Sequence, residues 1–258
     1  MSTGPIGVFD SGVGGLGVLA EIRALLPHED LVYVADQAFA PYGERDLSSV
    51  RQRAFAIVGY LIDAGATMVV VACNSASAAA LRELRERFPG TVFVGMEPAV
   101  KPAVGATKHG TIGVLATDAT FQGELFASVV DRHARNVAVV ARACPGLAAA
   151  IEDGTDAEGL VRQYTTDVVG RGADTIVLGC THYSFVSDRI RAVAGEGVRV
   201  IDPAPAVARQ VARLRGDGDA IRDGSTAYFT TGDANRFSDQ IRRLMGTAQA
   251  TTAVQIGG

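Results

Sequence analysis

The chain has 258 residues, 48% apolar and 20% charged, so it can bury a sizeable core as one large domain or two small ones. Its formal net charge of -4 argues against a nucleic-acid binder, because such proteins are normally basic. The chain contains no apolar run near the ~18 residues of a membrane span, no basic start typical of a secretory signal and only three cysteines. These features argue against membrane binding and a disulfide scaffold, and they predict a soluble protein of a reducing compartment.

Eight short runs rich in Val and Ile predict strands, at residues 6–9, 31–35, 67–72, 92–96, 111–116, 137–141, 175–179 and 198–201. Most gaps between them have helical spacing, as in residues 47–64 and 76–88. The tail after residue 205 predicts a helix at 206–214, a loop at 216–225, a strand at 226–230 and a helix at 234–244. Apolar strands that alternate with amphipathic helices are typical of an α/β fold with mostly parallel sheets.

The chain repeats itself at a nearly constant distance. IGVFDSG at 6–12 matches IGVLATD at 112–118, the strands at 31 and 137 match, and the ten residues from Gly65 match those from Gly172. This predicts two pseudo-symmetric domains, with the second at residues 98–204. The helix between the second and third strands is expected to be about four residues shorter in the second copy. The tail has no counterpart, so we expect it to pack on the first domain, which then comprises residues 1–97 and 205–258.

Cys73 and Cys180 occupy equivalent positions in the two copies, each after an apolar strand and before a residue that can cap a helix. Ligands of open parallel sheets bind beyond the carboxyl ends of the strands. The symmetry therefore predicts that both thiols face one cleft between the domains, where a helix N-terminus would lower a thiol pKa. Cys144 has no counterpart and is expected in the core.

Two opposed thiols suit three kinds of chemistry. A redox pair would normally have CxxC spacing, and a zinc site would need more ligands than His182 alone. Proton removal by one thiolate and proton return by the other thiol would invert a stereocentre. We predict no metal and no pyridoxal cofactor, since the only lysines, Lys101 and Lys108, lie in a segment that looks like a connector.

Four segments carry a specific resemblance: GVFDSGVGGL (7–16), ADQAFAPYGER (35–45), VVACNSASA (70–78) and GCTHYS (179–184). In order and spacing they resemble the cofactor-independent glutamate racemases of the aspartate/glutamate racemase family. The chain departs from that pattern at Ser75 and Gly17, where Thr is common, and at Ser184, where Pro is usual. The resemblance implies racemisation of glutamate, D-glutamate supply for peptidoglycan, a cytoplasmic location and a homodimer.

The resemblance also implies the site residues. Cys73 and Cys180 would move the proton, with Asp10 near the first thiol and His182 and Glu152 near the second. The substrate would contact Asp10, Ser11, Pro41, Tyr42, Gly43, Asn74, Ser75, Thr117, Thr120, Thr181 and His182. None of these expected site residues is an arginine, so both carboxylates are expected at helix N-termini and backbone N–H groups.

Simpler interpretations stay open at this stage. Asp10 at a strand end is also a possible helix cap, and Glu152 also suits a solvated helix end. The rival functions are aspartate racemisation and non-catalytic binding of a small molecule in the cleft. A binding protein, however, has no need of a second cysteine at the mirrored position.

Overall fold

The computed structural model describes residues 4–216 and 223–257, so most of the loop predicted at 216–225 lies outside the described residues. Its strands are β1 Ile6–Asp10, β2 Leu31–Ala35, β3 Met68–Val71, β4 Val92–Gly95, β5 Thr111–Ala116, β6 Ala138–Ala143, β7 Thr175–Gly179, β8 Arg199–Ile201, β9 Thr226–Thr230 and β10 Thr251–Ala253. The strands form two all-parallel sheets, ordered β10-β9-β2-β1-β3-β4 and β6-β5-β7-β8. The predicted α/β class is confirmed.

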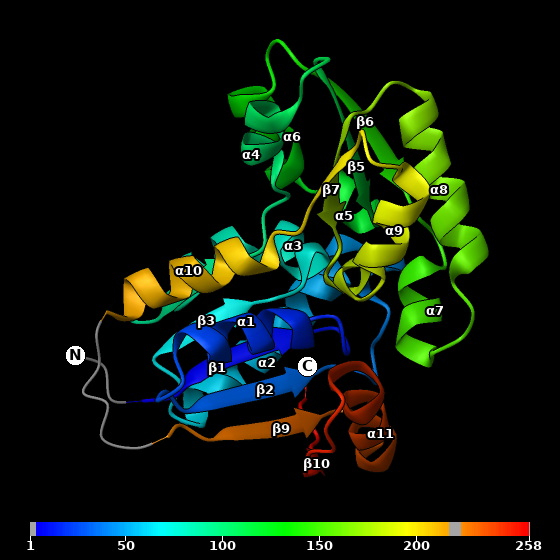
Figure 1. The fold of residues 1–258 in the computed structure, drawn as a ribbon. Coiled ribbons are helices and arrows are strands. Elements are labelled where there is room, and N and C mark those ends of the chain that lie inside the picture. Colours follow the sequence, from blue (N-terminus) through cyan, green and yellow to red (C-terminus); the bar gives the residue numbers. More distant parts are fainter. Residues whose placement is uncertain (1–3, 217–222, 258) are drawn as a thin grey trace.

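Helices connect the strands and cover the sheets (Figure 1). They are α1 Leu16–Leu25, η1 Tyr42–Glu44, α2 Leu47–Asp63, α3 Asn74–Arg87, α4 Val100–Ala106, α5 Asp118–Gln122, α6 Glu124–His133, α7 Leu147–Asp153, α8 Glu158–Gly170, η2 Thr181–Val186, α9 Ser187–Ala194, α10 Ala204–Arg215 and α11 Ala234–Met245, where η marks a 3-10 helix. The segment around Lys101, expected as a connector, is mostly α4. Its Pro102 lies in the first turn, where the missing N–H has no intrahelical partner to lose.

The two sheets repeat one strand order, β2-β1-β3-β4 in the first and β6-β5-β7-β8 in the second. Ile6 pairs with Met68 in the first copy, and the matching residues Ile112 and Thr175 pair in the second. The second strand differs: Ile6 pairs with Leu31, but Ile112 pairs with Val139, two residues beyond the sequence match. Helix α8 has 13 residues and α2 has 17, which confirms the expected shortening.

The tail packs on the first sheet, as expected. Strand β9 pairs in parallel with β2 along its whole length, and β10 extends that edge. Apolar residues of α10 and α11 join the core formed by α1 and the first sheet, including Val211 and Phe237. The exact domain boundaries, at residues 97/98 and 204/205, stay a prediction.

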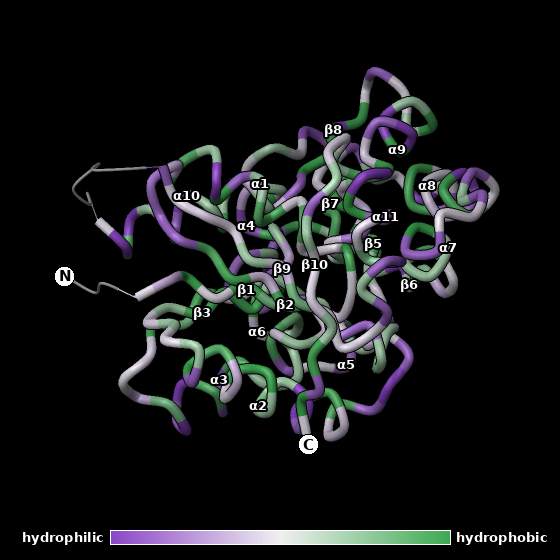
Figure 2. Tube along the Cα trace, turned by 90° about the horizontal axis from the view of Figure 1, so that it is seen from below, coloured by the Kyte–Doolittle hydropathy of each residue, from purple (hydrophilic) through white to green (hydrophobic). Residues whose placement is uncertain are grey.

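The strands that position the site are fully buried. Every residue of β1, β2, β3 and β7 lies in the interior, and the tube in Figure 2 is mostly green along β1 and β3. Apolar runs of this kind are expected where helices cover both faces of a parallel sheet. No helix among residues 4–216 and 223–257 combines the length and the apolar character required to traverse a bilayer.

Candidate active site

A cavity of about 320 Å³ lies where the two sheets approach each other, beyond the carboxyl ends of β1, β3, β5 and β7. It is lined by Ser11, Gln37, Ala40, Pro41, Tyr42, Gly43, Cys73, Asn74, Ser75, Thr117, Ala148, Ala149, Glu152, Asp153, Cys180, Thr181, His182, Gly232, Asp233 and Arg236. All the residues expected at the site therefore line one cavity, except Asp10 and Thr120.

Cys73 connects the end of β3 to the start of α3 and is only 5% exposed. Its sulfur lies 3.9 Å from the Ser11 hydroxyl. Burial raises the pKa of this thiol well above its ordinary value, and the neighbouring Asp10 raises it further. The expected lowering by the helix N-terminus is therefore wrong for Cys73, because desolvation of the thiolate outweighs the nearby backbone N–H groups.

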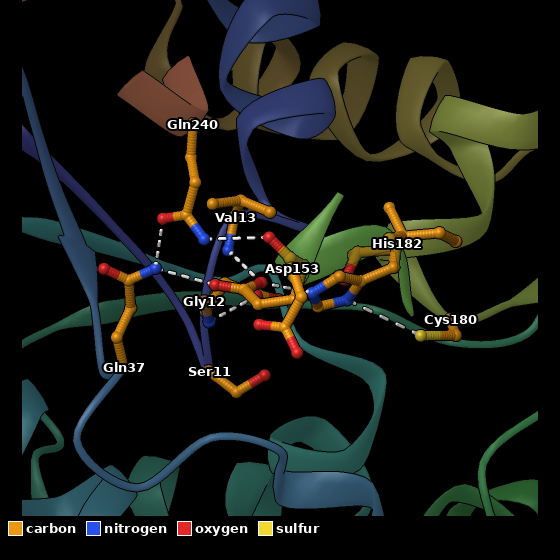
Figure 3. A network of polar contacts seen from close by, with 12 residues as sticks. Ser11, Gly12, Val13, Gln37, Asp153, Cys180, His182 and Gln240 are labelled. Atoms are coloured by element: carbon orange, nitrogen blue, oxygen red, sulfur yellow. Dashed lines mark hydrogen bonds and ion pairs between the residues drawn. The ribbon is translucent and has the colours of Figure 1, made fainter. Parts of the chain in front are cut away.

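Cys180 follows β7 and precedes η2, so it lies at the equivalent place in the second copy. Its sulfur is 3.8 Å from Nδ1 of His182, a contact drawn in Figure 3. The other ring nitrogen, Nε2, lies 2.7 Å from Oε2 of Glu152. Burial lowers the pKa of His182, but the hydrogen bonds to Cys180 and Glu152 outweigh burial and raise this pKa well above its ordinary value.

Glu152, near the end of α7, is 8% exposed, so the solvated helix end considered from the sequence is wrong. Its carboxylate accepts hydrogen bonds from the backbone N–H of Val13 at 2.8 Å and from Gln37 Nε2 at 2.7 Å. Burial raises the pKa of Glu152, but these bonds and the contact with His182 reverse the shift and lower it below the ordinary value. A buried, ionised carboxylate therefore faces the imidazole.

Asp10 ends β1 and is fully buried. It accepts hydrogen bonds from the Gly12 N–H at 2.8 Å and from the Thr181 hydroxyl at 3.0 Å, and burial raises its pKa. It does not cap α1, because the N-cap position is Gly15 and no side chain caps that helix. Asp10 thus lies one residue behind the cavity wall and contacts it through Thr181.

Hydroxyl and amide groups of both copies line the rest of the cavity. The hydroxyl oxygens of Ser75 and Thr117 are 3.0 Å apart, and Thr120 lies 3.0 Å behind Thr117, so it contacts the cavity only indirectly. Asn74 is 3% exposed, yet neither polar atom of its side chain has a partner within the described residues. Since buried polar groups are normally paired, this amide is available to a ligand.

The turn at Tyr42 and Gly43 closes one side of the cavity. The Tyr42 hydroxyl donates a hydrogen bond to Asp36, which in turn pairs with buried Arg53 at 2.8 Å. A Cβ at Gly43 would lie 2.6 Å from Cγ2 of Thr117, so only glycine allows the two copies to approach this closely. The Pro41–Gly43 turn thereby contacts the second sheet's unit directly.

Sequence reasoning missed several lining residues: Gln37, Ala40, Ala148, Ala149, Asp153, Gly232, Asp233 and Arg236. Gln37 lies inside the ADQAFAPYGER motif, so that motif could have identified it. Gly232, Asp233 and Arg236 come from the tail, which has no matching motif or repeat partner. Arg236 pairs with Asp153 at 2.6 Å, so one arginine does line the cavity.

The thiols are not bonded to one another: Cys73, Cys144 and Cys180 are all free. Cys144 is 2% exposed and packs in the apolar core of the second unit, as expected. Within the part of the chain that the structure describes, no three His, Cys, Asp or Glu side chains group as metal ligands.

Of the three departures from the family pattern, at Gly17, Ser75 and Ser184, one lies at the cavity. Ser75 lines the cavity and retains the hydroxyl that Thr would provide. Gly17 and Ser184 do not line it; they are neighbours, since a Cβ at Gly17 would lie 3.8 Å from Cβ of Ser184.

The family of the chain follows from its comparison with known proteins. The model of the Asp/Glu/hydantoin racemases matches residues 16–211. A glutamate racemase of Roseiflexus sp. (strain RS-1) is 49% identical over 252 residues, covering 94% of this chain and 93% of the relative. A glutamate racemase isoform of Bacillus anthracis superposes with a TM-score of 0.90 at 32% identity and 99% coverage of both chains.

A third relative, the Escherichia coli glutamate racemase in complex with L-glutamate and an activator, has a TM-score of 0.85 at 31% identity. It covers 98% of this chain, and 99% of its own chain is matched. From the matched span, the identities and the shared fold, the chain belongs to the Asp/Glu/hydantoin racemase family and is an amino-acid racemase.

Proposed function

We propose that the protein interconverts L- and D-glutamate by moving the α-proton between Cys73 and Cys180. The observation that carries the proposal is the pair of free, repeat-equivalent thiols that line one cavity from two different sheets. The glutamate racemases of Roseiflexus and Bacillus anthracis, similar over almost the whole chain, support glutamate as the substrate. The product D-glutamate would serve peptidoglycan synthesis.

Inversion at Cα needs a base on one face of the carbon and an acid on the other. One thiolate removes the α-proton, and the opposite thiol donates its own proton to the other face of the carbanion-like intermediate. The reverse reaction exchanges the two roles. Burial makes the Cys73 thiolate rare but strongly basic, which suits removal of a weakly acidic C–H proton.

His182, oriented by Glu152, would donate a proton to the Cys180 sulfur and accept one from it. The ionised carboxylate holds a hydrogen on Nε2 of the imidazole, so Nδ1 faces the sulfur. The raised pKa of His182 lets Nδ1 carry a proton when Cys180 is a thiolate and release it when the sulfur needs one. Asp10, behind Thr181, would tune proton transfer at Cys73 by its charge.

Substrate binding would use both copies. Ser11, Asn74 and Ser75 from the first copy and Thr117 and Thr181 from the second offer hydroxyl, amide and backbone N–H groups around the cavity. The start of α3 adds the N–H groups of a helix N-terminus, which suit a carboxylate. The unpartnered amide of Asn74 is a further donor for one end of the substrate.

The test is deuterium incorporation at Cα of glutamate in deuterated water, with protein freed of metal by exhaustive chelation and free of pyridoxal absorbance. Both enantiomers should racemise and acquire deuterium without any added cofactor, because two thiols suffice for both proton transfers. Activity that disappears on chelation and returns with zinc would contradict the cofactor-free mechanism. Binding of glutamate without exchange would leave a binding protein instead.

We further propose a cytoplasmic homodimer. The family resemblance supports both parts of this proposal. The location follows because a precursor of the cell wall is made inside the cell. Sedimentation of the purified protein at micromolar concentration checks the dimer, and a single species of 26.8 kDa would contradict it.

A further inference from the structure

Helix α11, in the tail, caps the carboxyl end of α7, in the other sheet's unit. The last carbonyl groups of a helix lack intrahelical donors. Here the carbonyl of Glu152 accepts from Gln240 Nε2 at 2.8 Å, and Arg243 Nη2 donates to the carbonyls of Ile151 and Glu152 at 2.9 Å. The backbone that carries Glu152 is therefore held from the first sheet's unit.

The Glu152 side chain is held by the same group of residues. Gln37 Nε2 donates to Glu152 Oε1 and to Gln240 Oε1, both at 2.7 Å, as Figure 3 shows for the labelled glutamines. Gln37 Oε1 accepts from the Thr230 hydroxyl at 2.9 Å. Both polar atoms of the Gln37 amide are partnered, and each amide has only one orientation that gives every bond a donor and an acceptor.

We propose that Gln240 and Gln37 are positioning residues for proton transfer at Cys180, because they fix the carboxylate that orients His182 toward that thiol. The inference rests on the proposed two-thiol function. Gln240 is 5% exposed and does not line the cavity, so it acts through Glu152 and not by contact with the substrate. Gln37 does line the cavity, but both polar atoms of its amide are bonded to protein groups.

The effect should be confined to one thiol. The chain of contacts runs from Gln240 and Gln37 to Glu152, then to His182 and the Cys180 sulfur. The side-chain contact of the Cys73 sulfur is with Ser11, which is not bonded to either glutamine. Without the amides, the Glu152 carboxylate loses one of its donors and the Glu152 carbonyl loses one of its two donors, since only Arg243 remains. The imidazole is then free to turn away from Cys180.

Racemisation rates alone cannot detect this asymmetry. L- and D-glutamate have equal free energies, so kcat/KM must fall equally in both directions for any variant. Exchange of the α-proton with deuterated water, measured for each enantiomer before racemisation, reports each thiol separately. The enantiomer whose exchange is lost in Cys180→Ser defines the Cys180 side.

The experiment compares Gln240→Leu and Gln37→Leu with Arg242→Ala, a control on the same helix whose side chain is 58% exposed and pairs with Asp239. Exchange on the Cys180 side should fall about 10-fold to 100-fold in either leucine variant, as expected for a misplaced catalytic group. Exchange on the Cys73 side and all rates of the control should change by no more than about twofold.

The two leucine substitutions should also be non-additive, since both act on one carboxylate. Equal losses on both sides would indicate general loosening of the cavity and overturn the proposal, as would unchanged exchange in both variants. Failure of the proposed function looks different: the unaltered protein would then exchange neither enantiomer.

Discussion

Cys73 and Cys180 provide the same chemical group in different surroundings. Cys73 has a buried carboxyl, Asp10, close enough to raise its pKa, whereas Cys180 has an imidazole at 3.8 Å. The two sides of the proposed intermediate are therefore served by unlike acid–base systems, although the protein repeats one fold. Variants at each cysteine should reveal this difference.

Replacement of either cysteine by serine should abolish racemisation in both directions, because a hydroxyl is far too weak an acid to supply a base near neutral pH. Partial exchange should separate the roles. The family resemblance implies that Cys73 takes the proton from D-glutamate and Cys180 takes it from L-glutamate. We therefore expect Cys180→Ser to retain exchange of the α-proton of D-glutamate and to lose that of L-glutamate, and Cys73→Ser to show the opposite bias. Proton NMR in deuterated water measures both.

Cys144→Ser is the control for these variants, since this thiol is 2% exposed in an apolar core and does not line the cavity. It should cost only local packing and leave exchange close to normal. An inactive but folded Cys144→Ser, together with near-normal racemisation by either of the other variants, would show that the two-thiol mechanism is wrong.

At single positions, the sequence predicts which residues lie at the cavity better than it predicts their pKa shifts. Cys73, Asn74 and Thr181 were all assigned to the site from motif and repeat, and the structure brings them to one cavity. The direction of the Cys73 pKa shift was not predictable, because it depends on burial by residues distant in sequence. The position of Asp10 behind Thr181 likewise depends on a contact between the two copies.

Among the elements, α2 has a buried ion pair that supports the cavity wall. Arg53 in α2 is 3% exposed and holds fully buried Asp36, which also accepts a hydrogen bond from Tyr42. The pair therefore connects the helix to the turn that contains Gly43. The contribution of this ion pair to stability can be measured by removing one charge while the other stays buried.

Arg53→Met should lower the free energy of unfolding by about 3–5 kcal/mol, because it leaves the Asp36 carboxylate buried and uncompensated. Urea titration followed by circular dichroism measures the change. The matched control is Arg82→Met, which removes surface pairs with Glu83 and Glu124 and should leave the free energy of unfolding almost unchanged. A loss of similar size in both variants would mean that the Asp36 pair has no special weight.

The periodicity of apolar residues predicts the longer helices and strands, but it does not reveal the shortest ones. All eight strands expected from apolar runs form within two residues of their predicted ends. Strand β10, with three residues, and the five-residue α5 have too few positions for any period to show. Strand β10 forms because it extends the edge of β9, a contact between segments that local pattern cannot encode.

For the molecule as a whole, the repeat explains why a site exists between the sheets. Strands β1 and β3 of the first copy correspond to β5 and β7 of the second. The residues that follow these four strands meet in one cavity. The tail breaks the symmetry, because α11 and Gly232 contact the site with no counterpart in the other copy. The sequence predicted the tail's placement but not its part in the site.

The spacing of the two copies should also set the length of the substrate. Polar groups on the first copy, such as Asn74 and Ser75, and on the second, such as Thr117 and Thr181, surround the cavity. Close contact of Gly43 with Thr117 limits how far the copies can adjust toward a shorter ligand. A substrate that binds both groups of donors must therefore have its carboxylates at a fixed separation.

Aspartate is one methylene shorter than glutamate, so it should leave buried donors at one end unpaired. Loss of a methylene alone gives roughly 10–200-fold discrimination, and unpaired buried polar groups give far more. We expect kcat/KM for aspartate to be lower than that for glutamate by more than this range, measured by circular dichroism of each pure enantiomer. Comparable values for the two substrates would contradict selectivity for glutamate and favour the rival assignment, in which aspartate is also racemised, because only a cavity that tolerates either length could treat them alike.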